Sequence, residues 1–453
     1  MQHRKFTEIK NPIIIYPLII SALAAFAIYL GFSTNYFLGD DFELLVQAIN
    51  GVSLFKPVSV HIRPVLRLHF QLVKIFGSNP FLFHLLSLFL HMVASISLYI
   101  FLKDLYSQTT ALISSLFFFL IFRANEVVFW ISAAGILYCF IFSFLSMHFY
   151  LRRKVWLSGI FLILALFSYE LWVVIPVVFL IFRKDRLLLY SSFMLGVLFF
   201  ILEYFKLGPF LGKYGGFSLK QLPFRMTVYI WKTVSPFGGL PPEPIFFFMF
   251  IALLGVLVYF ITKKDIKLIL PLAIYLTSSF ILSFSSIIPS RFYYFPVGAM
   301  VIFLALGLES SLKEIRVISV FLAGYFLVIS PVILYLDGKD YRNFSTMHLK
   351  LMLTTEQLLE GAVPGDRVEY KIGKLPDFTR LYLSSIKGTA KIVFVRKRAL
   401  GRLIYPEDLI TLSLWKRGLR PQFAPCNHFY PSIDVIIGEP PPVHRICFTV
   451  SKR

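Results

Sequence analysis

The sequence predicts an all-α polytopic membrane bundle followed by a small C-terminal α/β domain. Three observations indicate this fold class. Of the 453 residues, 57% are hydrophobic, and the mean hydropathy is +0.75. Apolar runs long enough to cross about 30 Å of hydrocarbon recur along the first three quarters of the chain. The remainder lacks such runs and contains short strand-like pieces instead.

The first apolar run extends from Asn11 to Phe32 and follows the basic segment Met1–Lys5. A secretion signal has an apolar core of about 7–15 residues, which is shorter than this run. We therefore expect an uncleaved first helix whose basic end lies in the cytoplasm.

From that start, about eleven transmembrane helices alternate across the cell membrane, and their inner loops are rich in cations, as in Leu151–Lys154 and Lys263–Lys264. An odd number of spans places the C-terminus outside. The chain then divides into a transmembrane domain, 1–336, and an extracytoplasmic α/β domain, 337–453. The expected spans cover residues 12–32, 80–103, 109–122, 131–150, 155–168, 170–183, 187–205, 245–262, 267–285, 293–310 and 317–336.

Two segments lie outside these spans. Residues 206–244 are rich in glycine and proline pairs, which indicates an outer loop, and an interfacial or short re-entrant helix is expected at 224–234. The C-terminal segment has strand-like pieces at 391–395 and 434–437 and a turn signal at 364–366. Its length suits one small domain.

The charge balance is strongly basic, with 45 Lys and Arg against 24 Asp and Glu and a net charge of +21. These cations cluster at the ends of apolar runs. That placement favours inner loops that attract anionic membrane lipids, and it lacks the interleaved aromatic side chains of a nucleic-acid groove. No nucleic-acid partner is expected.

Cysteine is rare in this chain. Cys139 falls within an expected span and is interpreted as a small apolar filler. Cys426 and Cys447 both fall in the expected exterior domain, where either a disulfide or free thiols are compatible with the sequence. Two cysteines with His428 and His444 nearby do not make a convincing zinc site.

Two adjacent acids, Asp40 and Asp41, stand directly after the first apolar run. Acids are scarce in this chain, and desolvating two like charges together is costly. A carboxylate pair at the mouth of a membrane bundle is therefore a candidate general base or cation site. It is the strongest indication of function in the sequence.

Other ionisable residues are expected at the same outer face: His61, Arg63, Glu126, Glu170 and Arg291. Each also has a structural interpretation. Arg63 can reach lipid phosphates, Glu126 and Glu170 can cap helices, and Arg291 can anchor an aromatic belt. Their concentration at one face favours a functional site.

The order of several short motifs resembles the GT-C membrane glycosyltransferases, in particular the protein O-mannosyltransferase-like, dolichyl-phosphate-mannose-dependent group. The similarity runs over residues 30–310. It departs from that group at Tyr169, where a lysine is usual, and in the C-terminal segment, which has no tetratricopeptide repeats. The motifs that carry the resemblance are Gly39–Asp41, Arg63–Val65, Asn79–Leu86, Asn125–Ser132, Leu166–Glu170 and Arg291–Pro296.

The resemblance implies an inverting hexosyltransferase that uses a sugar carried on a polyprenyl phosphate and acts at the outer face of the membrane. By motif position, Asp40 and Asp41 are the catalytic acids, with Asp40 preferred as the general base on the acceptor hydroxyl. Arg291 is expected to bind the donor phosphate first, with Arg63 second. Glu126 is expected on the acceptor side.

His61, Tyr169 and Glu170 complete the expected substrate site. No organic cofactor is implied. A divalent metal is not favoured, because the outer face lacks the further, closely spaced carboxylates that a metal site needs. The sequence identifies neither the sugar nor the acceptor, which can be a protein, a glycan or a lipid.

Two other classes of protein remain as alternatives. A sugar or lipid transporter or flippase explains many spans, but it is expected to show internal repeats and helices broken at the midplane, and no repeat is evident. An O-antigen polymerase or ligase also carries outer arginines, but it does not require acids beside the first helix. Transfer of label from a polyprenyl-phosphate sugar distinguishes these alternatives.

Overall fold

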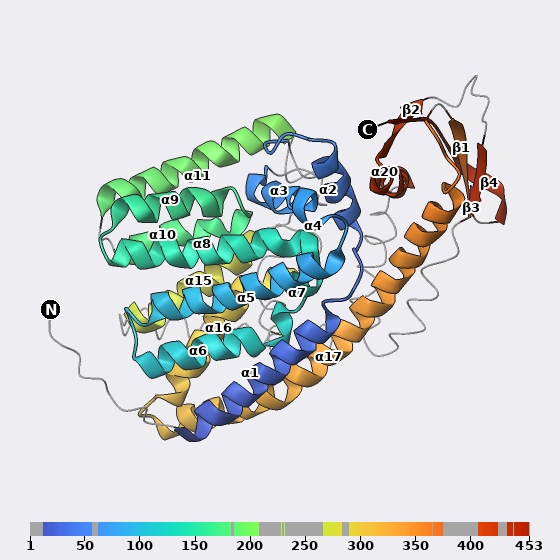
Figure 1. The fold of residues 1–453 in the computed structure, drawn as a ribbon. Coiled ribbons are helices and arrows are strands. Elements are labelled where there is room, and N and C mark those ends of the chain that lie inside the picture. Colours follow the sequence, from blue (N-terminus) through green and yellow to red (C-terminus); the bar gives the residue numbers. More distant parts are fainter. Residues whose placement is uncertain are drawn as a thin grey trace.

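A computed structural model describes residues 12–56, 62–182, 185–207, 228, 231, 266–282, 290–364, 366–374, 406–424, 433–437 and 439–452. Long helices lie side by side in a bundle, and a strand-containing C-terminal part lies at one end (Figure 1). The first nine α-helices are α1 (Pro12–Phe32), α2 (Asp40–Ile49), α3 (Pro64–Gln71), α4 (Val73–Phe76), α5 (Pro80–Leu102), α6 (Gln108–Leu120), α7 (Glu126–Phe129), α8 (Ala134–Leu151) and α9 (Val155–Leu166).

The remaining described elements of the bundle include short 3-10 helices, several of which directly precede an α-helix. The elements are η1 (Phe122–Ala124), η2 (Ile131–Ala133), η3 (Glu170–Val173), α10 (Val174–Phe182), α11 (Arg186–Leu207), α15 (Ile266–Leu282), η5 (Ser290–Tyr293), α16 (Tyr294–Leu308) and α17 (Lys313–Leu358).

Among the described residues, five helices are long and apolar enough to cross a membrane, and further apolar helices there are shorter. The sequence-based prediction of a helical, multi-pass membrane protein is confirmed at this level. Each expected span other than 245–262 coincides with an apolar helix, and 245–262 lies outside the described residues. The number of spans and the side on which the C-terminus lies remain predictions. The five helical segments that contain a long apolar window are Ile15–Phe32, Pro80–Leu102, Ile131–Leu151, Arg291–Leu308 and Lys313–Gln357.

The core of the bundle is aromatic. The rings of Phe118 and Phe140 stack with centroids 4.5 Å apart, and Tyr294 packs edge-on against both. A Cβ at Gly298 would lie 3.0 Å from the Phe140 ring, so this glycine lets α16 approach α8 closely. Helices α1 and α11 keep large apolar side chains exposed, as expected for surfaces that face lipid.

The first two expected spans, 12–32 and 80–103, are joined by a segment that is not a simple loop. It folds into α2, α3 and α4. Helix α2 is amphipathic and buries Phe42, Leu44, Leu45 and Ala48, while Gln47 on its other face is half-buried. A ten-residue amphipathic helix is too short to appear as an apolar run, so the hydropathy pattern does not reveal it.

Helix α17 also differs from expectation, because it continues beyond the apolar stretch that ends at 336. Its polar second half buries residues at helical spacing, and this stripe packs against the outer part of the molecule. The division of the chain into 1–336 and 337–453 remains a prediction, since α17 passes through this point without interruption. The buried stripe consists of Tyr341, Ser345, His348, Met352 and Thr355.

The C-terminal part contains helix α20 (Pro406–Lys416) and a four-stranded sheet in the order β2-β4-β1-β3. Strand β1 pairs parallel to β3 and antiparallel to β4, and β2 pairs antiparallel to β4. Strand β3 coincides with the expected piece at 434–437. The expected strand at 391–395 and nearly all of the expected helix at 224–234 lie outside the described residues. The strands are β1 (Arg367–Lys374), β2 (Leu419–Ala424), β3 (Ile433–Ile437) and β4 (Glu439–Lys452).

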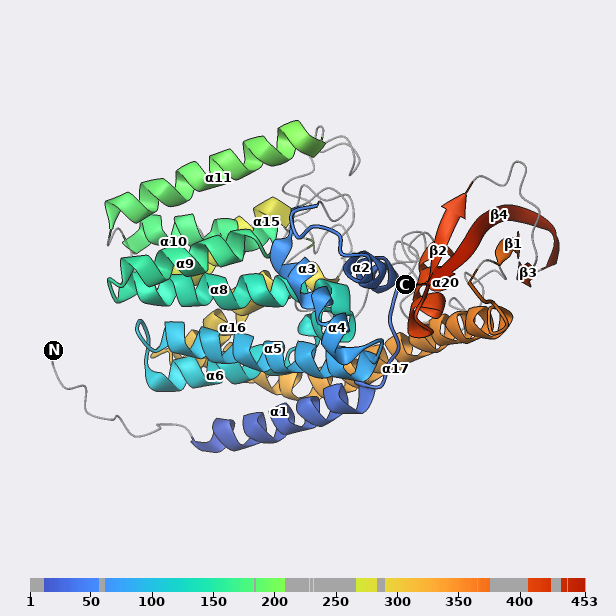
Figure 2. The ribbon, with the colours of Figure 1, turned by 45° about the horizontal axis from the view of Figure 1, so that its top comes forward.

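A second hydrophobic cluster joins α20 to the outer helices. Leu409 and Leu412 of α20 pack together with buried side chains of α2 and with Met352 of α17. Lys416 forms an ion pair with Glu356 at 2.6 Å, which adds a polar link between α20 and α17. Figure 2 shows α20 between the sheet and the end of the bundle that carries α2. The C-terminal part therefore packs directly against the helix that begins with Asp40.

Candidate functional site

The two adjacent acids open helix α2, which lies at one end of the bundle (Figure 1) and contacts η2. Gly39 precedes them with φ of 48°, a left-handed conformation that residues with a Cβ rarely adopt. This glycine lets the chain turn sharply from Leu38 into α2. The first turn of a helix is its electropositive end and favours carboxylates.

The segment that leads into the acids is held by the second half of α17. Arg342 donates to the main-chain carbonyl of Gly31, and His348 Nδ1 lies 3.2 Å from the carbonyl oxygen of Phe37. Gly338 allows this approach, since a Cβ there would lie 2.3 Å from the ring of Phe32. The unexpected length of α17 thus fixes the start of α2.

Asp41 is fully enclosed, with 0% of its surface exposed. Its Oδ2 accepts a hydrogen bond from the main-chain N–H of Leu38 at 2.9 Å, and its Oδ1 accepts one from the N–H of Ser132 at 2.7 Å. Burial raises the pKa of Asp41 well above its ordinary value, and the adjacent charge of Asp40 raises it further. The two N–H donors oppose this shift.

Asp40 has a different environment, because its side chain is only half-buried. Its Oδ1 accepts a hydrogen bond from the Ser132 hydroxyl at 2.7 Å. Burial raises the pKa of Asp40, whereas the positive charge of Arg291 and the donors Ser132 and Trp130 lower it. Asp40 is therefore the acid of the pair that a substrate can reach and that stands near a cation.

Arg291 is the second residue of η5 and is held by Glu126. Its Nη1 lies 3.0 Å from Glu126 Oε1, and its main-chain N–H donates to Glu126 Oε2 at 3.0 Å. Glu126 is fully buried, while 23% of the Arg291 side chain is exposed. The Arg291 guanidinium lies 4.8 Å from the centre of the Trp130 ring. Glu126 thus fixes a partly accessible cation beside Asp40.

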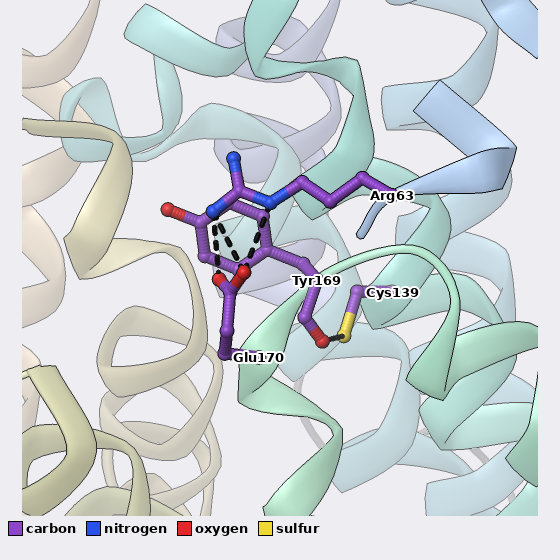
Figure 3. Close-up of polar contacts among 4 residues, drawn as sticks. All are labelled: Arg63, Cys139, Tyr169 and Glu170. Atoms are coloured by element: carbon purple, nitrogen blue, oxygen red, sulfur yellow. Dashed lines mark hydrogen bonds and ion pairs between the residues drawn. The ribbon is translucent and has the colours of Figure 1, made fainter. Parts of the chain in front are cut away.

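A second arginine is held in a similar way near by (Figure 3). Both oxygens of Glu170 accept hydrogen bonds from Arg63, at 2.8–2.9 Å. The Arg63 guanidinium lies 4.1 Å from the centre of the Tyr169 ring. Figure 3 also shows Cys139, whose Sγ is 3.4 Å from the Tyr169 carbonyl oxygen. Tyr169 thus provides a stacking surface for Arg63 at the position where the resembled family carries a lysine.

The two arginine groups belong to one region, since Arg291 interacts electrostatically with both Asp40 and Tyr169. The expected site residues that the structure describes form three groups of direct contacts: the acid pair with Ser132, Arg291 with Glu126, and Arg63 with Tyr169 and Glu170. The interpretation of Glu126 and Glu170 as simple helix caps is incomplete, because each pairs with an arginine far along the chain. His61 lies outside the described residues. The assembled residues are Asp40, Asp41, Arg63, Glu126, Tyr169, Glu170 and Arg291.

Sequence reasoning did not select Trp130 or Ser132 as individual site residues, although both occur in the motif Asn125–Ser132. Trp130 is buried, and its indole N–H lies near enough to Asp40 to lower the pKa of that carboxyl without reaching hydrogen-bond geometry. Asp337 was also missed, and it accepts a hydrogen bond from Asn125 across the α17 contact. Serine and tryptophan carry no charge, so only the motif itself pointed to them.

Metal binding and disulfide formation remain predictions. Within the ranges that the structure covers, no three His, Cys, Asp or Glu side chains are grouped so that they could hold a metal ion. Cys426 and the side chain of Cys447 lie outside the described part, so their pairing is not addressed.

No family model and no curated protein matches this sequence. Among solved structures, ArnT from Cupriavidus metallidurans bound to undecaprenyl phosphate is 13% identical, with a TM-score of 0.43 and 98% of both chains covered. The apo oligosaccharyltransferase of Archaeoglobus fulgidus is 12% identical, with a TM-score of 0.46; 88% of this chain and 61% of that chain are covered. These scores are too low to support an argument about function, which therefore rests on the site residues.

Proposed function

We propose that this chain is an integral-membrane glycosyltransferase of the GT-C kind that transfers a sugar from a polyprenyl phosphate to an acceptor hydroxyl. One observation carries the proposal. A half-buried carboxylate, Asp40, lies within electrostatic range of the guanidinium of Arg291, which a fully buried Glu126 holds in place. A base and an anion-binding cation at one mouth of a membrane bundle match the needs of this reaction.

In the proposed reaction, Asp40 takes the proton of the acceptor hydroxyl while the acceptor oxygen forms a bond to the anomeric carbon. The bond between that carbon and the phosphate oxygen breaks, and its electron pair stays with the phosphate. The products are the glycosylated acceptor, protonated Asp40 and a lipid phosphate dianion. Attack opposite the departing phosphate inverts the anomeric centre.

The leaving phosphate gains negative charge as the bond breaks, and a fixed cation stabilises that charge without a proton transfer. Arg291 is the first candidate for this role, because Glu126 orients it and part of its side chain remains exposed. Arg63 is the second, oriented by Glu170 and Tyr169. Arginine suits the task since its planar fork matches phosphate oxygens.

Asp41 is proposed to organise the site rather than to receive the proton. It is enclosed and accepts two main-chain N–H groups, from Leu38 and Ser132, so it ties the start of α2 to the turn η2. Asp40 shares that turn through the Ser132 hydroxyl. The pair therefore divides into one accessible and one enclosed carboxyl.

The finer features of the proposal follow from the motif order and the topology. The ordered motifs favour the protein O-mannosyltransferase-like branch, and the donor is then a hexose on a polyprenyl phosphate. The chain is proposed to lie in the cell membrane with the site and the C-terminal part on the extracytoplasmic face. A protein, a glycan or a lipid hydroxyl serves as acceptor.

Washed membranes that contain the wild-type chain, supplied with a radiolabelled polyprenyl-phosphate sugar and cell-envelope acceptors, test the proposal directly. We expect label to move to an acceptor with release of polyprenyl phosphate, at a rate proportional to the amount of the chain. Membranes without the chain are the control. Label that crosses the bilayer while it remains on the lipid would instead identify a flippase and overturn the proposal.

A further inference from the structure

Ser132, in the turn η2 that precedes α8, contacts both acids through two different groups. Its main-chain N–H donates to Asp41 Oδ1 at 2.7 Å, and its hydroxyl donates to Asp40 Oδ1 at 2.7 Å. The Ser132 side chain also helps to lower the pKa of Asp41. The two adjacent carboxyls therefore share one residue as their hydrogen-bond donor.

The position of Ser132 is fixed by its neighbours. Trp130 has an extended backbone, φ −121° and ψ 109°, and the chain then turns into η2. The side chains of Ile131 and Ala134 are fully buried and belong to the same hydrophobic cluster as Phe42 of α2. The turn is thereby packed against α2, and the N–H of Ser132 has little freedom to turn away from Asp41.

The two groups of Ser132 differ chemically. A main-chain N–H can only donate a hydrogen bond, so the oxygen of Asp41 that faces it must always be an acceptor. A hydroxyl can rotate, and it donates to a carboxylate or accepts from a carboxylic acid. The serine hydroxyl can therefore stay bonded to Asp40 both before and after that residue takes up a proton.

We propose that Ser132 is a positioning residue that assigns different tasks to the two adjacent carboxyls. Its N–H holds Asp41 in an enclosed structural position, and its hydroxyl aims Asp40 toward the acceptor and favours its ionised form. This inference rests on the proposed function and adds to it the residue that makes the acid pair unequal. Ser132 acts through Asp40 and makes no contact with substrate in this account.

The charges around Asp40 determine how the effect can be measured. Asp41 and Glu43 face it from its own helix, Arg291 from η5, and Ser132 and Trp130 from the turn before α8. Loss of the Ser132 hydroxyl removes one of the groups that lower the pKa of Asp40. That pKa then rises, and the base becomes protonated, and thus inactive, at a higher pH than in the wild type.

The test is the pH profile of kcat/KM for sugar transfer by membranes that contain Ser132→Ala, Ser132→Thr and Ser132→Val. We expect the acid limb of the profile to move up by about one pH unit for the alanine and valine variants, because a lost hydrogen bond to a charged group is worth about a tenfold change in ionisation. Ser132→Thr keeps the hydroxyl and should restore the wild-type profile. Threonine and valine have nearly the same shape, so this pair separates the hydroxyl from packing even if the alanine variant accumulates poorly.

Ser97→Ala is the matched control. Ser97 is buried on α5 and donates to the carbonyl of Ala94 at 2.8 Å, so its loss tests a generic buried serine. Its pH profile should not move. In an Asp40→Asn background, Ser132→Val should leave the residual activity unchanged, because there is no longer an ionisable base to position.

The outcomes separate this inference from the proposed function. An active wild type whose acid limb is the same in the threonine and valine variants overturns the role of Ser132 and leaves the transferase proposal standing. A shift that persists unchanged for Ser132→Thr also overturns it. A wild-type chain that transfers no sugar under any condition overturns both.

Discussion

Charged side chains gather at both ends of the bundle, and the two groups are built differently. At the end that carries α2, two acids stand side by side, and each arginine is held by its own glutamate. Helices α5 and α8 end at the opposite end of the bundle (Figure 1). Directly after α5, Asp104 lies 2.7 Å from His148 Nδ1 and 3.0 Å from Arg152 Nη2. One acid there faces two basic partners, and Arg152 is half exposed.

The difference appears in the direction of the pKa shifts. Burial raises the pKa of Asp40 and Asp41, and neighbouring donors only partly oppose it. Burial also raises the pKa of Asp104, but hydrogen bonds from His148 and Arg152 outweigh it, and the net shift is downward. An acid with a lowered pKa is typical of a structural ion pair, whereas acids with raised pKa values are candidates for proton transfer.

The largest expected effect comes from Asp40→Asn, compared with Asp104→Asn at the other end. Asparagine keeps the size of the side chain but removes the base, so sugar transfer should fall by about 10²–10⁴-fold. Asp104→Asn should leave the transfer rate per folded molecule close to wild type. The measurement is transfer at equal membrane abundance. An equal loss in both variants would show that the two ends do not differ in role.

A smaller effect is expected when each end loses an arginine. Arg291→Ala should weaken use of the lipid donor, with transfer reduced by about 10–100-fold and a raised KM for the donor, because the phosphate loses a charge-assisted partner. Arg152→Ala removes an arginine that is largely exposed, and its effect on donor KM should be negligible. Donor titration with both variants checks this, and an unchanged KM in Arg291→Ala would exclude it as the phosphate ligand.

The pH dependence of activity should reflect the raised pKa of the acid pair. The base must be ionised, so activity should be lost as the pH falls through a pKa above about 3.9, the ordinary value for aspartate. The two carboxyls titrate together, and the acid limb belongs to the pair. The pKa of Asp104 is shifted in the opposite direction, downward. Its ionised form therefore stabilises the fold above the unfolded-state pKa, and this stabilisation is lost as the pH falls through the lower folded-state pKa.

Asp104→Asn therefore serves as the control for the pH profile of transfer. Its acid limb should coincide with that of the wild type. If the acid limb instead shifts in Asp104→Asn and not in variants of Asp40 or Asp41, the catalytic base lies at the other end of the bundle.

The two ends of the bundle should lie on opposite sides of the membrane, and reporter fusions can show this without a change in activity. A reporter fused after Arg316 should read cytoplasmic, because residues 313–316 are cation-rich, and one at the C-terminus should read extracytoplasmic. A cytoplasmic C-terminus would put the acid pair and the C-terminal part on the wrong side for a donor whose head group lies outside.

The sequence was sufficient to predict those features that depend on local pattern. Apolar runs marked the long helices, and the scarcity of acids drew attention to Asp40 and Asp41. The pairings were not predictable in the same way, because they join distant positions. Glu126 and Arg291 are 165 residues apart, and Arg63 and Glu170 are 107 apart. Only the packed bundle brings them into contact.

The outer helices were missed for a related reason. Helix α2 and the second half of α17 are amphipathic, and their buried faces alternate with polar residues at helical spacing. Met352 of α17 and Leu412 of α20 are buried in the same hydrophobic cluster as side chains of α2. Hydropathy averaged over a span-length window does not detect such faces, since their partners lie far away in the chain.

The central claim is that the adjacent carboxyls of Asp40 and Asp41 make the site a base for sugar transfer. The most direct test is sugar transfer from a polyprenyl phosphate by the Asp40→Asn/Asp41→Asn double variant, at a membrane abundance equal to that of the wild type. The account predicts at least the loss expected for Asp40→Asn alone, about 10²-fold or more. Transfer close to the wild-type rate would contradict it.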